Sequence, residues 1–240
     1  MKAPARVLRI PSKYAMYFDG INDYASIPRN RSLDLVAGNF SVGLWWVHPG
    51  RAGTWVGIVD QGRNAVRDFW VLTTVGGKGV SFGVGDGSTL IEISGPELPA
   101  LVFHYITCVR RGRYLEIWVN GSRAITRELT ITPALGTYPI ELGRRSLDAH
   151  YSNQYLSCVQ IYSRALNAEE VTWNYDNPGN PVKNGLVLWL QADPNNIKDV
   201  DGDGVLEWVD LSGFGNHGKI YGATLVGVVK SPARVLPPVR

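Results

Sequence analysis

The stretch VFHYITCVRRGRYLEIWVNG, residues 102–121, decides the fold class. It contains two apolar runs rich in β-branched and aromatic residues, 102–110 and 114–119, on either side of Gly112. Such runs favour β-strands, and Gly112 can adopt the positive φ that a tight turn between them needs. The stretch therefore predicts a β-hairpin.

Within residues 114–119, apolar residues occupy every second position, so one face of this strand should enter a core and the other should lie half exposed. Similar short runs recur between clusters of Gly, Asn, Asp and Pro, and they predict strands at residues 14–18, 40–47, 55–59, 69–73, 79–84, 90–94, 156–162, 186–190 and 219–226. Only one helix is predicted, from Asn167 to about Tyr175, because Asn167 and Glu170 fit a capping box. The chain is predicted to be all-β.

Composition limits the classes of function. Charged residues make up 19% of the 240 residues, below the roughly 25% of typical soluble domains, and 27 residues are glycine. Lys and Arg number 24 against 21 Asp and Glu, without a basic patch that would indicate nucleic-acid binding. No segment is long enough to span a membrane. Two cysteines are too few for a disulfide framework, and we expect buried thiols at Cys108 and Cys158. The alternative is a disulfide between them, which requires that their predicted strands are neighbours.

Several segments resemble, in their order along the chain, laminin-G-like jelly-roll domains of the concanavalin A-like lectin and glucanase superfamily. They are YFDGINDY at 17–24, SLDL at 32–35, FSV at 40–42, LEIWVNG at 115–121 and IYSRAL at 161–166. The resemblance implies a two-sheet antiparallel jelly-roll sandwich with one short helix.

The order of the segments departs from the family at the C-terminal end. GLVLWL at 185–190 and the segments up to residue 224 resemble those that usually open the domain, and KAPARVL at 2–8 recurs as KSPARVL at 230–236. We predict a single domain over residues 1–240, apparently circularly permuted, in which 185–226 supplies the family's N-terminal strands and 227–240 is a linker-like tail. This segment either folds back beside strands 156–162 and 14–18 or completes the sheet of another molecule, and folding back has the advantage in effective concentration.

The twelve-residue stretch DVDGDGVLEWVD has the spacing of an EF-hand calcium loop. Asp199, Asp201 and Asp203 fall at positions one, three and five, the Val205 carbonyl falls at seven, and Asp210 stands at twelve in place of the usual Glu. These oxygen ligands suit Ca²⁺, which we predict as the cofactor. The alternative is an Asp-Gly turn without metal.

Ligand binding is predicted at loops that combine aromatic rings with planar polar groups. The resemblance adds a rim site with Asp19 or Asp23 near calcium, for which a capped turn is the alternative. Trp45, Trp118 and Trp189 lie in predicted strands and should be core. The candidate ligand residues are Asp19, Asp23, Arg63, Asn64, Trp70, Arg144, Tyr151 and Asn153.

These features favour a non-catalytic module that binds carbohydrate or a cell-surface ligand and is stabilised by calcium. The alternative is a structural subunit of a virion or surface filament, assembled through strand exchange. A glycoside hydrolase is the third possibility, but no strand carries the two carboxylates at alternate positions that such enzymes use, so no catalytic residue is assigned. Residues 1–17 lack a signal-type apolar run, so we expect an extracellular or virion-associated protein delivered by other means, or a cytoplasmic one.

Overall fold

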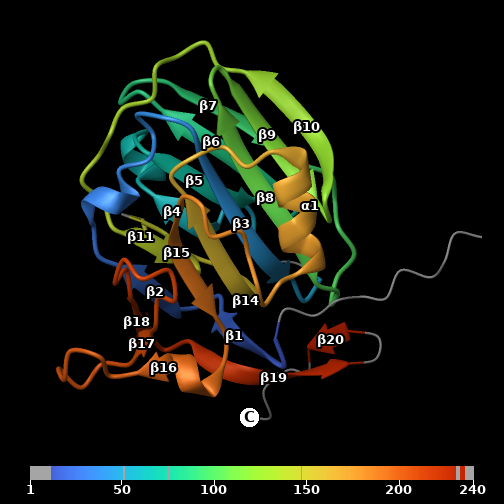
Figure 1. The fold of residues 1–240 in the computed structure, drawn as a ribbon, viewed down its shortest axis with the longest axis vertical. Helices are drawn as coiled ribbons and strands as arrows, with labels where there is room; N and C mark the ends of the chain where they lie inside the picture. The colour runs from blue at the N-terminus through green and yellow to red at the C-terminus, as the bar shows by residue number, and fades with distance from the viewer. Residues whose placement is uncertain (1–11, 51, 75, 147, 231–232, 236–240) are drawn as a thin grey trace, which may run out of the picture.

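Two antiparallel sheets contain nearly all strands of the structure (Figure 1). The computed structural model describes residues 12–50, 52–74, 76–146, 148–230 and 233–235. Sheet A has the spatial order β10 (Ser122–Glu128), β9 (Tyr114–Val119), β8 (His104–Arg111), β3 (Phe40–Val47), β14 (Asn153–Tyr162), β1 (Tyr14–Asp19), β19 (Thr224–Lys230) and β20 (Ala233–Val235). A further strand, β15 (Leu186–Gln191), also pairs with β14.

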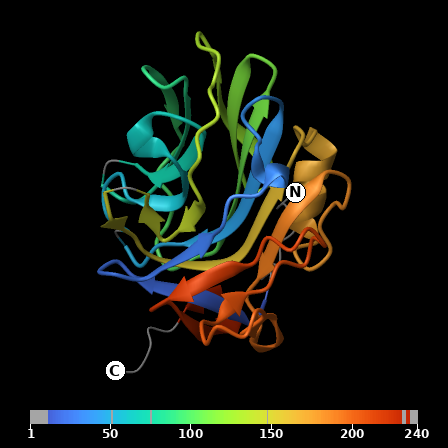
Figure 2. The same cartoon turned by 90° about the vertical axis from the view of Figure 1, so that its left-hand side faces the viewer.

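Sheet B forms the second layer (Figure 2). Its order is β16 (Ile197–Lys198), β17 (Glu207–Trp208), β18 (Gly218–Tyr221), β2 (Tyr24–Ile27), β11 (Ile140–Leu142), β4 (Gly57–Gln61), β5 (Phe69–Thr73), β6 (Val80–Gly85) and β7 (Leu90–Ser94). Short elements complete the fold: the paired strands β12 (Arg144–Arg145) and β13 (His150–Tyr151), helix α1 (Ala168–Asp176), and the 3-10 helices η1 (Arg31–Leu33), η2 (Arg63–Ala65) and η3 (Pro194–Asn196). The predicted two-sheet antiparallel sandwich with one short α-helix is confirmed.

The main core lies between the two sheets. Phe40 of β3 in sheet A packs on Phe69 and Phe82 of sheet B, with ring centroids 5.1 and 5.9 Å apart. Leu115 and Ile117 of β9 are fully buried in the same core, as their alternation predicts. Each buried side chain of this size contributes about 1.5–3 kcal/mol, so the period of two in the sequence fixes which face of a strand turns inward.

The other face of sheet A is covered by α1, which corrects one expectation. The sequence predicts that the alternate residues of β9 are half exposed, but Glu116 and Trp118 are only 4% and 9% exposed. Trp118 belongs to a buried cluster with Val171 of the helix, and its Nε1 donates to Glu116 at 2.8 Å. Alternation within one strand cannot reveal that a distant helix packs over its outer face.

Two local expectations are confirmed. Helix α1 begins with the predicted capping box, in which the Glu170 N–H donates to the Asn167 side chain at 2.9 Å. Cys108 and Cys158 are free and buried. Cys108 faces the core between the sheets and Cys158 lies in the cluster on the outer face of sheet A, so the two thiols point to opposite faces.

The C-terminal segment folds back on its own chain. β15 pairs with β14, and β19 pairs with β1, the positions expected for the folded-back arrangement. Residues 219–226, however, are not one strand. Gly222 has a φ of 77° and separates β18, which joins sheet B, from β19, which joins sheet A. A positive φ interrupts the extended backbone that a continuous strand needs.

The linker-like tail is also shorter than predicted, because residues 227–230 belong to β19 and 233–235 to β20. The remaining residues of the 230–236 repeat and all of its partner at 2–8 lie outside the described residues, and circular permutation stays a prediction. Sequence reasoning missed β10, whose seven residues are all exposed, and the short strands β2 and β11. None of the helices in the described ranges is long and apolar enough to cross a membrane.

A candidate ligand site on the outer face of sheet B

A row of mostly polar residues crosses the face of sheet B that points away from the core. Partners directly opposite each other on antiparallel strands point to the same face. Flanking residues such as Ile27, Ile140 and Phe69 belong to the core, so the pleat turns the row outward. We call this set the outer row, and from β16 to β7 its members are Lys198, Glu207, Lys219, Ser26, Glu141, Asp60, Trp70, Gly83 and Glu92.

The centre of the outer row is covered, and Asp60 is fully buried there. Its carboxylate accepts hydrogen bonds from the backbone N–H of Ser146 at 2.8 Å, from the Ser146 hydroxyl, and from the backbone N–H of Arg63 at 3.3 Å. Ser146 lies between β12 and β13 and Arg63 in η2, so these two segments close over β4. Burial raises the pKa of the Asp60 carboxyl to about 7, although the hydrogen bonds oppose the shift.

Trp70 is the second covered member of the row. A Cβ at Gly83 would come within 2.4 Å of Trp70 Nε1, so glycine at this position makes room for the indole. The indole Nε1 donates to Glu92 at 2.5 Å, and the Arg63 guanidinium carbon lies 5.1 Å from the ring centroid. The structure thus brings the candidates Arg63 and Trp70 together, but the tryptophan is closed to solvent. Asn64 follows Arg63 in η2, and its side chain lies outside the described residues.

Toward the edge of sheet B, tyrosine rings become accessible. Arg144 donates to Glu141 through Nε at 2.5 Å and Nη2 at 2.7 Å, and its guanidinium carbon lies 3.5 Å from the centroid of Tyr24. Tyr24 stacks on Tyr221 with ring centroids 4.5 Å apart and an interplanar angle of 15°. Tyr151 lies 6.4 Å from Tyr24, so the candidates Arg144 and Tyr151 belong to one cluster. Tyr221 is 38% exposed and offers an accessible ring.

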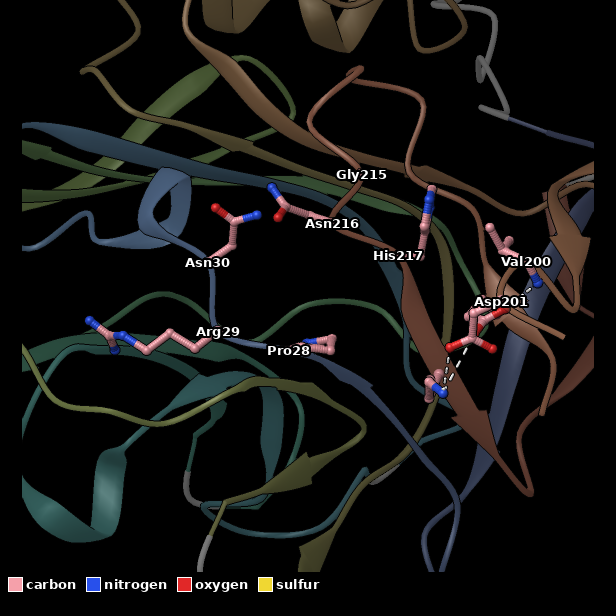
Figure 3. A pocket seen from close by; sticks show the side chains of 10 residues that line it. Pro28, Arg29, Asn30, Val200, Asp201, Gly215, Asn216 and His217 are labelled. Atoms are coloured by element: carbon pink, nitrogen blue, oxygen red, sulfur yellow. Dashed lines mark hydrogen bonds and ion pairs between the residues drawn. The ribbon is translucent and has the colours of Figure 1, made fainter. Parts of the chain in front are cut away.

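A cavity of about 210 Å³, lined mostly by polar and charged residues, lies next to these rings, between β18 and the chain that follows β2 (Figure 3). Three segments line it: residues 28–30, residues 200–207 of the Asp-rich loop, and residues 215–219. Lys219 lies in the cavity wall, and Tyr221 is two residues further along the same strand, about 7 Å away on the same face. We call the cavity together with the Tyr24–Tyr221 pair the open edge.

The Asp-rich loop is a tight turn stabilised by its own carboxylates. Asp199 accepts hydrogen bonds from the backbone N–H groups of Gly202 at 2.7 Å and Gly204 at 3.0 Å. Asp203 accepts from the N–H of Val205 at 2.9 Å. These contacts are those of an Asp-Gly turn, which the sequence leaves open as the alternative to a metal site.

The same loop gathers carboxylates around one ammonium group. Oxygens of Asp199, Asp201 and Glu207 lie within 4.8 Å of one another and could together hold a metal ion. Lys219 Nζ is 2.9 Å from Asp201, contacts Asp203, and is 3.8 Å from Glu207. Hydrogen bonds to Asp203 and Asp201 raise the pKa of Lys219 above its usual value. The donor set fits Ca²⁺ in chemistry, but Lys219 competes for the same oxygens.

Asp210 does not join this cluster, contrary to the EF-hand spacing. One of its oxygens accepts from the N–H groups of Trp189 and Ser212, both at 2.9 Å, and the other accepts from the Ser212 hydroxyl at 2.7 Å and the Asn216 N–H at 3.0 Å. The chain continues from the loop into the extended strand β17, which carries Asp210 to a bridge with β15. Glu207, at the ninth position of the stretch, faces the other acids in its place.

Asp210 also orders the third wall of the cavity. Its backbone N–H donates to His217 Nδ1 at 3.0 Å, so Nε2 carries the ring proton of the neutral imidazole and is a donor. Asn216 is 3% exposed and donates its amide to two oxygens at 2.7 and 2.9 Å, whereas its Oδ1 has no hydrogen-bond partner in the described part of the chain. Figure 3 shows the side chains of Asn216 and Asn30 pointing toward one another.

The rim candidates Asp19 and Asp23 accept hydrogen bonds within the turn that follows β1. Asp19 accepts from the N–H groups of Ile21 at 2.7 Å and Asn22 at 3.2 Å, and Asp23 accepts from the N–H of Asp19 at 3.0 Å. Asn153 is the register partner of Asp19. These contacts match the capped-turn alternative. Within the described residues, the group that includes Asp199 is the only set of three or more His, Cys, Asp or Glu that could hold a metal.

Sequence reasoning selected the Asp-rich loop but missed most other residues of the open edge. Lys219 and Tyr221 were predicted only as part of a strand, and Tyr24, Asn216 and His217 carried no site prediction. The signal was present in part, because His217, Lys219 and Tyr221 alternate as outward residues of one strand do. Their partner Tyr24 lies at the other end of the chain, and its contact with Tyr221 has no local signature.

The fold and the open edge define a jelly-roll sandwich of the lectin type, with a polar face accessible at one sheet edge. The chain belongs to the concanavalin A-like lectin/glucanases superfamily, whose family model matches residues 19–172. The match ends within α1, so residues 185–226 lie beyond it. No curated protein matches the sequence.

Solved structures with low sequence identity share the fold. A candidate carbohydrate-binding protein of Bacteroides ovatus superposes with a TM-score of 0.69 at 14% identity, over 90% of this chain and 60% of its own. The binding domain of Paraclostridial Mosquitocidal Protein 1 has a TM-score of 0.57 at 15% identity, over 68% and 43%. The CBM40 domain of the Ruminococcus gnavus IT-sialidase, bound to α2,3-sialyllactose, has a TM-score of 0.53 at 13% identity, over 66% and 96%. This chain therefore spans less than two thirds of the first two proteins.

Proposed function

We propose that this chain is a non-catalytic carbohydrate-binding domain whose ligand site is the open edge. The observation that carries the proposal is the position of a cavity of about 210 Å³, lined mostly by polar residues, beside the stacked pair Tyr24–Tyr221, of which the Tyr221 ring is accessible. Sugars present hydroxyl groups and apolar ring faces, which bind planar polar groups and aromatic rings respectively. The fold shared with carbohydrate-binding domains supports the proposal.

The dimensions suit one sugar ring in the cavity and a second ring toward Tyr221. Pockets for drug-sized ligands hold about 300–1,000 Å³, so the smaller cavity favours a single small polar group. Lys219 and Tyr221 are about 7 Å apart along β18, and a linked glycan would continue along β18 and β2. Glycans or glycosylated cell-surface molecules are the partners that this site favours, and an extracellular or surface location goes with them.

A glycan array probed with the full chain tests the proposal, followed by calorimetric titration of any bound oligosaccharide. Tyr221→Ala is expected to weaken binding at least about tenfold, because stacking on an accessible ring is lost. Tyr114→Ala is the matched control, since Tyr114 is 48% exposed on β9 of the other sheet. An array without any bound glycan, or equal losses in the two variants, contradicts the proposal.

The structure shows one feature that a hydrolase could use. Glu141 and Asp60 are cross-strand partners, so two carboxylates lie side by side, and the pKa of Asp60 is raised to about 7 by burial. Glycosidases use such pairs. Both side chains are at most 3% exposed, and Glu141 is held by Arg144 in two hydrogen bonds. We therefore assign the pair to the structure of the domain, and turnover of a bound glycan that Asp60→Asn abolishes would contradict this assignment.

We further propose that Ca²⁺ stabilises the Asp-rich loop through Asp199, Asp201 and Glu207, in competition with Lys219. The support is that oxygens of these three carboxylates lie within 4.8 Å of one another, and that two of them, Asp201 and Glu207, also lie near the Lys219 ammonium. The alternative role as a filament or virion subunit rested on donation of residues 185–226 to another molecule. Those residues supply strands that pair within the chain, which favours a self-contained domain. A single monomeric peak in size-exclusion chromatography is the expected result.

A further inference from the structure

The Asp-rich loop beside the cavity carries an excess of negative charge. Its four carboxylates lie near two ammonium groups, Lys219 and Lys198, the second of which stands opposite Glu207 in the outer row, so two negative charges remain. A bound Ca²⁺ ion would neutralise them, so the excess belongs to the metal-free loop. Like charges repel strongly where water is partly excluded, so an anionic ligand entering the cavity meets an unfavourable potential. The carboxylates of this set are Asp199, Asp201, Asp203 and Glu207.

The second cation of the cavity wall is also occupied. Arg29 forms an ion pair with Asp34 and a weaker one with the buried Asp68, at 3.4 Å. Lys219 is held by the loop carboxylates. Every Lys and Arg side chain that lines the cavity is therefore paired, and binding a carboxylate ligand through either of them requires breaking an existing pair. The exchange is costly where it leaves a buried carboxylate without its partner, which holds for Glu207 beside Lys219 and for Asp68 beside Arg29.

The cavity wall contains acceptors that can still receive a hydrogen bond. Asn216 Oδ1 is buried and has no partner in the described residues, and the carboxylates of Asp201 and Glu207 can accept further hydrogen bonds. A buried acceptor without a donor costs roughly 1–3 kcal/mol until a ligand satisfies it. A hydroxyl group can donate to these oxygens, whereas an ionised carboxylate or sulfate has no proton to donate. His217 Nε2–H is the complementary donor of the wall.

On the basis of the proposed function, we infer that the cavity takes an uncharged sugar residue and discriminates against sugars that carry a carboxylate or sulfate. Three observations favour this class of ligand: the negative charge of the Asp-rich loop, the pairing of both cations of the cavity wall, and the unpartnered acceptor Asn216 Oδ1. The R. gnavus domain with the same fold is bound to a sialylated ligand. The lining of the cavity, and not the shared fold, would then set the ligand class.

The test is an array on which each neutral oligosaccharide is matched by a sialylated or sulfated form, probed with the full chain both in chelator and in Ca²⁺. In chelator, the expected result is binding to neutral members, with the acidic form of a bound glycan at least about tenfold weaker. An acidic form that binds as well as or better than its neutral counterpart, or a free amino sugar preferred over its N-acetylated form, overturns the inference. If no glycan binds at all, the proposed function itself fails.

A charge variant tests the cause. Asp201→Asn with Asp203→Asn releases Lys219 from its two closest partners, and both positions are exposed, so the fold should be kept. The acidic member of a matched pair is expected to gain at least about fivefold in affinity relative to the neutral one. The double variant Glu97→Gln with Glu128→Gln removes the same charge from exposed sites outside the cavity. It should change neither the affinity for the acidic glycan nor that for the neutral one. Unchanged discrimination in the first variant overturns the inference.

Discussion

The centre and the edge of the outer row differ in what covers them and not in their sequence pattern. At the centre, Asp60 and Trp70 are fully buried beneath η2 and the turn between β12 and β13. At the edge, Tyr221 is accessible and Lys219 lines a cavity. Both regions place polar or aromatic residues at outward positions of the same sheet. The comparison shows that an outward position serves the structure where a segment covers it and can serve a ligand where none does.

The largest effect on stability is expected when the covered centre of the outer row is disrupted. Trp70→Ala removes a buried indole that holds Glu92 and packs against Arg63, and loss of a buried tryptophan costs about 3–5 kcal/mol of unfolding free energy. Tyr221→Ala at the open edge should cost less than about 1 kcal/mol, because its ring is accessible. Denaturant unfolding of both variants measures the difference. Similar losses would remove the distinction between the two regions.

The second prediction concerns pH. The pKa of Asp60 is about 7 in the folded state and about 3.9 in an unfolded chain, so the folded state binds this proton more tightly. Its contribution to stability is therefore greatest below about pH 4 and is lost as pH rises to about 7.

Asp60→Asn is expected to remove this dependence. Between pH 5 and pH 7.5 the wild-type chain should lose stability relative to the variant by roughly 1–3 kcal/mol, as measured by unfolding at each pH. The half-exposed acid Asp34 provides the control, since Asp34→Asn should leave the slope unchanged. Parallel stability curves for wild type and Asp60→Asn would show that the buried carboxyl does not titrate as inferred.

The third prediction concerns calcium binding by the Asp-rich loop at the open edge. Ca²⁺ added after chelation should raise the melting temperature by a few degrees, because a ligand that binds only the folded state stabilises it. Lys219→Ala should enlarge this rise, since the ammonium no longer competes for Asp201. Asp199→Asn should reduce it. Identical melting curves in chelator and in Ca²⁺ for all three proteins would contradict calcium binding. Lys219 would then balance the loop carboxylates without a metal ion.

The smallest expected effect on stability is that of His217→Asn. The asparagine oxygen can still accept from the Asp210 N–H, while the Nε2–H donor of the cavity is withdrawn. Unfolding free energy should change by less than about 1 kcal/mol, and affinity for a neutral glycan should fall about three- to tenfold. His150→Asn, at a half-exposed ring on β13, is the control. Unchanged affinity would place the ligand away from His217.

The strands with strong alternation were predicted well, and the failures have physical causes. β7 and β9 have the predicted bounds because period-two apolar residues must all turn to one core. β10 was missed because all of its residues are exposed, so burial imposes no pattern on it. The strand predicted at 219–226 fails because Gly222 redirects the chain between two sheets. Asp210 was misplaced because the twelfth position of an EF-hand lies where a helix leaves the loop, whereas here the extended strand β17 carries Asp210 away from it.

The candidate site was predicted only in fragments. Sequence reasoning selected the Asp-rich loop, and Asp201 does line the cavity. It also selected Arg144 and Tyr151, which lie beside Tyr24. The calcium set and the ligand residues themselves stay predictions until they are measured. Nothing in the residues around Trp70 indicated that η2 would close over it.

By itself, the sequence determined the all-β class, the inward face of the strongly alternating strands, the capped helix and the superfamily. The first three follow from local periodicity and turn chemistry, which act over a few residues, whereas the superfamily follows from the resemblance of several ordered segments to its members. Only the tertiary structure decided that Tyr24 stacks on Tyr221, that Lys219 balances the Asp-rich loop, and that Asp60 lies beside Glu141. Such pairs join strands far apart in the chain, and their register is set by packing of the whole sandwich rather than by either strand alone.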